Sequence, residues 1–160
     1  MEMSDSLENM WNNEFPLDCD EENALITQSH YYDFDDFSQI MQSTDPQSSL
    51  SILNLNCRSL IKNFNELYVT LASLPNEFGV ITMEETWLDD DLENLVKMPG
   101  YTLKTKHKKA CKEGGGLGIY VNDNLTYTFR DDLNCDIGYQ SFFDHIFVEI
   151  ENANDKIIIY

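Results

Sequence analysis

The sequence predicts an α/β domain preceded by a disordered acidic segment. Three observations favour this fold class. The charge changes abruptly near residue 50, a strand, helix, strand pattern occupies residues 51–83, and short β-like segments follow residue 100. A helix between two apolar strands is typical of α/β proteins, in which it connects neighbouring parallel strands.

The segment 1–49 differs in composition from the predicted domain at 50–160. Residues 1–50 contain twelve Asp and Glu residues and neither Lys nor Arg, and the whole chain of 160 residues carries a net charge of -19. High charge without sustained apolar periodicity predicts disorder over most of this segment. Residues 31–41 are the exception, because apolar side chains recur there at helical spacing and predict a short helix: Phe34, Phe37, Ile40 and Met41.

A strand–helix–strand unit opens the predicted domain. Residues 50–55 and 78–83 are short apolar strands. Between them, Phe64, Leu67, Tyr68 and Leu71 form a stripe that predicts an amphipathic helix at about 61–74, and Pro75 ends it. Such a crossover is right-handed and makes the strands parallel, so their carboxyl ends should meet at one sheet edge, where α/β proteins build sites.

Further β-like segments follow at residues 101–106, 117–121, 125–129, 143–149 and 156–160. The glycine-rich run at 114–118 lacks the Gly-Lys-Ser/Thr of a phosphate-binding loop and the register of a dinucleotide-binding loop. We therefore expect its glycines to let a strand begin in tight packing.

Polar side chains stand at the ends of the two predicted parallel strands. Asn54 and Asn56 close the first strand, and Glu84 and Glu85 end the second. Carboxylate and amide oxygens are ligands that Mg²⁺ accepts together with several waters. The pattern predicts a magnesium site at this sheet edge, with Glu85 as the metal ligand and Glu84 as a solvated neighbour, unless Glu84 is the side chain that points inward. The alternative is a turn-capping glutamate beside ordinary strand-end amides.

Four sequence blocks, in order, resemble a known family. They are Asn-Leu-Asn-Cys-Arg-Ser-Leu at 54–60, Glu-Thr-Trp-Leu at 85–88, Pro-Gly-Tyr at 99–101 and Gly-Gly-Gly-Leu-Gly-Ile-Tyr-Val at 114–121. From about residue 31 to residue 160 the chain resembles the endonuclease/exonuclease/phosphatase domain, in the variety found at the front of non-LTR retrotransposon polyproteins.

The resemblance implies a fold, a metal and a reaction. The fold would be the N-terminal half of a two-sheet endonuclease/exonuclease/phosphatase sandwich, with the opposing sheet supplied by the family's second half. Glu85 would bind the catalytic Mg²⁺, Asn54 would act as a catalytic residue that orients the phosphate, and Asn56 stands where some members carry a second acid. The Tyr-x-Pro-Pro, Gly-Asp-Phe-Asn and Ser-Asp-His blocks of the second half do not occur in this sequence.

These implications lead to an expected function. The chain would be a fragment of a Mg²⁺-dependent DNA endonuclease, weak or inactive alone, because removing members of a catalytic unit costs orders of magnitude in rate. A sheet face left without its partner, around residues 157–159, would favour self-association.

Basic residues mark candidate contacts with the DNA backbone. Five of the ten bases lie within residues 104–112, and the candidates are Arg58, Lys104, Lys106, Lys108 and Lys109. The alternative is a solvated hairpin loop. A net charge of -19 opposes DNA binding elsewhere on the chain.

Three local features have structural interpretations. Ser59 is expected to cap the helix predicted at about 61–74. Trp87 and Leu88 are expected to lie in the core, where a large apolar pair fixes the loop that carries Glu85. The acidic run at 89–93 lacks the spacing of a calcium-binding loop and is expected to be a solvated turn.

Two functions of other kinds stay open. The acidic, aromatic N-terminal segment could fold into the groove of a protein partner, which would make the chain an interaction module with a degenerate nuclease remnant. A metal-dependent phosphatase would share the fold and the metal. Four scattered cysteines argue against a zinc site or a disulfide framework. The absence of a signal peptide or a membrane-spanning run predicts an intracellular protein.

Overall fold

The computed structural model describes residues 30–45, 49–107, 115–133, 145–152 and 155–160. The chain divides into two compact units, Met1–Tyr32 and Asp33–Tyr160. Every helix and strand given below belongs to the second unit. The predicted disorder of residues 1–29 falls outside the described residues.

The helix expected in the acidic segment is present as α2, Phe34–Ser43. The side chain of Asp33 caps it by accepting the backbone N–H of Asp36 at 2.9 Å. Phe37 stacks on Phe78 with ring centroids 6.3 Å apart, and Met41 is buried. Helix α2 is therefore part of the compact unit that contains the sheets, Asp33–Tyr160.

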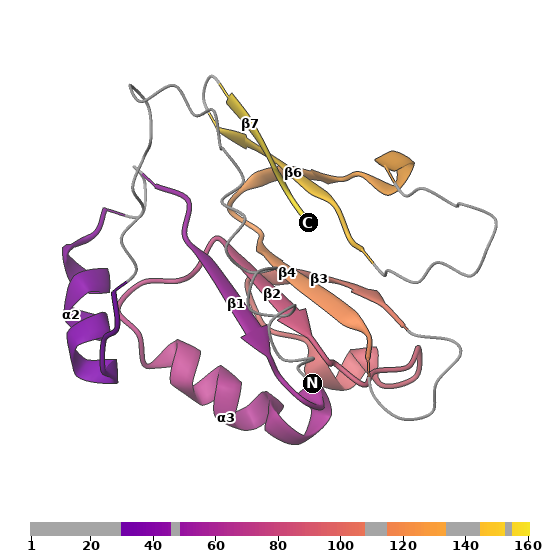
Figure 1. Cartoon of the computed structure of the whole chain (residues 1–160), viewed down its shortest axis with the longest axis horizontal. Coiled ribbons are helices and arrows are strands. Elements are labelled where there is room, and N and C mark those ends of the chain that lie inside the picture. Colours follow the sequence, from indigo (N-terminus) through magenta and orange to yellow (C-terminus); the bar gives the residue numbers. More distant parts are fainter. Residues whose placement is uncertain (1–29, 46–48, 108–114, 134–144, 153–154) are drawn as a thin grey trace, which may run out of the picture. The chain divides into compact units, whose positions relative to one another are not determined.

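The predicted strand–helix–strand unit is confirmed. Strand β1 is Ile52–Asn56, helix α3 is Leu60–Ala72 and strand β2 is Val80–Glu84. β1 and β2 pair in parallel along their whole length, so their carboxyl ends meet at one sheet edge (Figure 1).

Two antiparallel strands complete the first sheet. β4, Leu117–Asn122, pairs with β2, and β3, Tyr101–Lys106, pairs with β4, which gives the order β1-β2-β4-β3. A hydrophobic core covers one face of this sheet, and α3 packs on it through Ile61, Phe64, Leu67 and Leu71. Tyr68, which the sequence placed on the same stripe, is 39% exposed.

A second, three-stranded antiparallel sheet follows in the chain. It consists of β5, Thr126–Phe129, β6, Val148–Asn152, and β7, Asp155–Ile159, in the order β5-β6-β7. Two short 3₁₀ helices, η1 at Glu93–Val96 and η2 at Asp131–Leu133, lie in the connections.

The two sheets share a second hydrophobic core. Val80, Ile119 and Val121 of the first sheet contact Val148 and Ile150 of the second in this core. We expected the family's second half to supply a sheet opposite the first, and here residues of this chain form one. The fold is therefore mixed α/β with two sheets, and the self-association of an exposed sheet face stays a prediction.

The strand β7 accounts for the apolar run that the sequence analysis left without a partner. Because successive side chains of a strand point to opposite faces, Ile159 is buried in the second core and Ile157 packs against it. Ile158 points away and is 47% exposed.

A charged network lies on the second sheet around Glu149. Its carboxylate accepts hydrogen bonds from Lys156 Nζ at 2.6 Å and from Arg130 Nη1, and Arg130 also pairs with Asp132 at 2.7 Å. The hydrogen bond from Lys156, together with that from Arg130, lowers the pKa of Glu149 below its usual range. Arg130 likewise lowers the pKa of Asp132.

This network predicts a dependence of stability on pH. A carboxylate whose pKa is lower in the folded than in the unfolded state stabilises the folded state at neutral pH. This contribution is lost as the pH falls below the ordinary carboxyl range of about 4. Urea unfolding at pH 7 and pH 3 should show a smaller loss of stability for Glu149→Gln than for the wild type. The control is Glu66→Gln on α3, which should lose as much as the wild type, and an equal loss for all three proteins would contradict the prediction.

Candidate functional site

The carboxyl ends of β1 and β2 bring the predicted polar residues to neighbouring strands. Asn54 lies beside Thr82 in the parallel register, and its Nδ2 donates to Thr82 Oγ1 at 2.8 Å. Asn56 lies beside Glu84. Asn54, Asn56 and Glu84 are exposed, so this part of the sheet presents amide and carboxylate groups to solvent.

Beyond the strand ends, two loops are joined by backbone hydrogen bonds. Ser59 N–H donates to Glu85 O at 2.8 Å, and Leu60 N–H donates to Thr86 O at 2.9 Å. The amide of Cys57 donates to Glu84 O at 3.0 Å. These bonds fix the start of α3 against the loop that carries Glu85.

Four non-glycine residues in these loops have a positive φ. The angles are +39° at Arg58, +83° at Ser59, +55° at Glu85 and +53° at Trp87. Such conformations cost free energy and persist where the surroundings impose them, often at functional sites. Ser59 is the N-cap residue of α3, as predicted, but its side chain makes no capping hydrogen bond. Its amide donates to Glu85 O instead.

The Glu85 carboxylate is held by two donors. Its Oε2 accepts Trp87 Nε1–H at 2.8 Å and the backbone N–H of Gly115 at 2.8 Å. Glu85 is half-buried, whereas Glu84 is exposed. The structure therefore gives Glu85 a fixed orientation at the sheet edge and leaves Glu84 solvated.

The glycine run packs against the same loop. Thr86 N–H donates to Gly116 O at 3.2 Å, and Trp87 N–H donates to Gly115 O at 3.0 Å. A Cβ on Gly116 would lie 2.7 Å from Thr86 Oγ1, and one on Gly118 would lie 2.9 Å from Met83 Cε. The expectation that these glycines permit tight packing is confirmed for both positions.

Cys57 lies close to the Glu85 carboxylate, and no pattern in the sequence predicts this neighbour. Its Sγ donates to Glu84 O at 3.1 Å. Burial raises the pKa of the Cys57 thiol, a backbone hydrogen bond offsets part of that rise, and the charge of Glu85 adds to it. The group is a thiol at neutral pH and therefore a poor nucleophile.

The predicted basic contacts are distributed unevenly. Lys104 Nζ pairs with Asp131 at 3.0 Å and lies 5.6 Å from the centre of the Phe129 ring. Lys106 is half-buried on the same strand, Arg58 is exposed, and Lys108 and Lys109 lie outside the described residues. Lys104 is thus paired within the chain, although its side chain stays 38% exposed.

The acidic run after Leu88 forms a turn that His107 holds. His107 Nε2 lies 3.2 Å from Asp90 Oδ1 and 3.1 Å from Glu93 Oε1. Asp90 is almost fully exposed, in agreement with the predicted solvated turn. The contact to His107 could not be predicted, because it depends on how β3 ends beside this turn.

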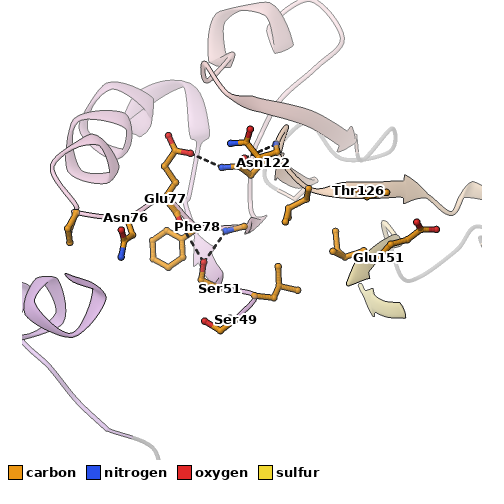
Figure 2. A pocket seen from close by; sticks show the side chains of 14 residues that line it. Ser49, Ser51, Asn76, Glu77, Phe78, Asn122, Thr126 and Glu151 are labelled. Atoms are coloured by element: carbon orange, nitrogen blue, oxygen red, sulfur yellow. Dashed lines mark hydrogen bonds between the residues drawn. The ribbon is translucent and has the colours of Figure 1, made fainter. Parts of the chain in front are cut away.

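A pocket of about 570 Å³ lies near the amino ends of β1 and β2, away from the edge that carries Glu85 (Figure 2). Asn122 Nδ2 donates to Glu77 Oε2 at 2.8 Å, and Asn122 Oδ1 accepts Asn124 N–H at 2.9 Å. Ser51 Oγ accepts Gly79 N–H at 3.0 Å. No motif in the sequence predicts a site at these residues.

Comparison with models of known protein families gives no match, and comparison with curated proteins gives none either. Within the described part of the chain, no helix is long and apolar enough to cross a membrane. The same part contains no group of three or more His, Cys, Asp or Glu side chains that could hold a metal ion.

Proposed function

We propose that the chain carries part of a Mg²⁺-dependent site for phosphodiester hydrolysis, of the kind found in the endonuclease/exonuclease/phosphatase family, and that it cleaves DNA weakly or not at all alone. The observation that supports this proposal is the Glu85 carboxylate, fixed by two N–H donors in a loop of unusual backbone conformation beside β1.

The donor set fits Mg²⁺ in kind. Mg²⁺ binds through one or two carboxylates and keeps several waters, and the remaining ligands are phosphate oxygens of the substrate. Glu85 would supply the carboxylate. Asn54, whose Nδ2 is occupied by Thr82, would offer its Oδ1 to a phosphate or a bound water. When bound, the ion would polarise the phosphate and stabilise charge on the leaving oxygen.

Three features of the chain argue for weak activity. One carboxylate gains little over fully hydrated Mg²⁺, which gives up its waters reluctantly. Lys104 is paired with Asp131, and a net charge of -19 repels the DNA backbone.

The test is metal binding and plasmid nicking by the whole chain. We expect weak Mg²⁺ binding by calorimetry, a loss of affinity of at least about tenfold for Glu85→Gln, and no change for the neighbouring exposed Glu84→Gln. Nicking of supercoiled plasmid should be little or none.

Three outcomes would change the proposal. Unaltered Mg²⁺ binding in Glu85→Gln would refute the assignment of the ligand. Robust nicking that this substitution abolishes would show that the chain completes its own site. Hydrolysis of a small phosphomonoester without any nicking would favour the phosphatase alternative.

A further inference from the structure

Trp87 is a large apolar side chain exposed next to the proposed metal ligand. Its neighbours Thr86 and Leu88 are buried, yet Trp87 is 40% exposed. The sequence analysis expected Trp87 in the core with Leu88. This expectation is correct for Leu88 and wrong for Trp87, because the left-handed conformation at Trp87, with φ +53°, directs the chain differently from an extended strand.

The indole is held in place while it is exposed. The backbone N–H of Trp87 donates to Gly115 O at 3.0 Å, and the indole Nε1–H donates to Glu85 Oε2 at 2.8 Å. The only polar atom of the side chain is therefore satisfied within the protein. A ring tethered through Nε1 to Glu85, on a backbone that is itself bonded to Gly115, loses little conformational freedom when a flat ligand stacks on it.

We infer that Trp87 is a stacking platform for an unpaired nucleobase, and that the substrate of the site is single-stranded or locally unpaired nucleic acid. This inference rests on the proposed function, because the nucleobase would belong to the same strand as the phosphate at Glu85. Bases inside a duplex have both faces covered by neighbouring bases, so only a base outside the stack can contact the ring.

The net charge of the chain opposes contact with the phosphates of any nucleic acid, so binding needs a contribution of another kind. Most nucleic-acid-binding proteins gain affinity from Lys and Arg contacts to phosphates, whereas this chain has a net charge of -19 and Lys104 is engaged by Asp131. Stacking of a base on an aromatic ring contributes substantially per base, and the base itself carries no charge for the chain to repel. The exposed ring thus supplies affinity in addition to any contact that exposed basic residues such as Arg58 make with the phosphates.

The experiment uses the fluorescence of Trp87. The chain has two tryptophans, Trp11 and Trp87, so the Trp11→Phe variant of the full chain reports on Trp87 alone. A single-stranded DNA oligonucleotide should quench its emission in EDTA and in Mg²⁺, and the matched duplex should quench it far less. An abasic strand of the same length separates base stacking from phosphate contact and should cause no quenching.

Variants measure the contribution of the ring. By anisotropy of a labelled single strand, Trp87→Leu should weaken binding by about 5- to 150-fold, and Trp87→Phe should retain part of the affinity because a ring remains. Leu95→Ala, which truncates another exposed apolar side chain of the same connection, should have no effect. Circular dichroism of each variant establishes that it is folded.

Any of four results would overturn the inference. They are binding by folded Trp87→Leu equal to that of the wild type, unchanged Trp87 emission at saturation, duplex binding equal to that of the single strand, and no binding of any strand. The outcome is separable from that of the proposed function. Quenching in EDTA without Mg²⁺ binding at Glu85 would leave the platform and remove the metal site. Mg²⁺ binding without quenching would do the reverse.

Discussion

Gly116→Ala should destabilise the protein by about 2–5 kcal/mol in urea unfolding. Two costs combine. Gly116 has a φ of +85°, a left-handed conformation that costs an L-residue about 1–2 kcal/mol. A Cβ there would also lie 2.7 Å from Thr86 Oγ1, and overpacking a buried contact costs about 1–3 kcal/mol.

Gly100 provides the matched control. Its φ is +81°, but a Cβ on it would meet no atom within 4 Å. Gly100→Ala should therefore show only the conformational cost of about 1–2 kcal/mol. Adding Thr86→Ala should reduce the penalty at Gly116, because it removes the atom in conflict, and leave the penalty at Gly100 unchanged. Equal losses of stability in Gly116→Ala and Gly100→Ala would contradict a steric conflict between a Cβ at Gly116 and Thr86 Oγ1.

Leu60→Ala should lower the free energy of unfolding by about 2–5 kcal/mol. Leu60 begins α3, is fully buried in the first core and donates its amide to Thr86 O at 2.9 Å. Truncation leaves a cavity that the neighbouring side chains only partly fill, so the cost exceeds that of transferring the lost atoms to water.

The effect of Leu60→Ala is best compared with Val69→Ala on the same helix. Val69 is 67% exposed, and its replacement should change stability by no more than about 0.5 kcal/mol. Denaturant unfolding with an unchanged m-value would identify both as changes of native stability. A small effect at Leu60 would mean that the start of α3 is not anchored in the core as described.

Local patterns of the sequence predicted most of the elements. The strand–helix–strand unit follows from two clear periodicities, and strand β3, Tyr101–Lys106, has the predicted bounds. Strand β6 differs: it was expected from residue 143 and begins at Val148. Ile146 is buried in the second core although it precedes that strand, so an apolar residue in a strand-like run can be buried without pairing.

The details of the candidate site were less predictable. The positions of Glu85 directly after β2 and of Asn54 within β1 follow from the strand pattern of the sequence. The positive φ of Ser59 and Trp87 has no signature in the sequence, since hydrogen bonds to residues distant in sequence impose it. The missing side-chain hydrogen bond at the Ser59 cap and the exposure of Trp87 could not be predicted for that reason.

Strand β2 lies between β1 and β4, and its residues enter both hydrophobic cores: Ile81 and Met83 face one, and Val80 faces the other. Amide hydrogens at such an inner position exchange with solvent through the rarest opening events, whereas edge strands open locally and often. Glu85 directly follows this strand. Its carboxylate is therefore carried by the segment that should be the last to open, and fluctuations that release an edge strand would leave its position unchanged.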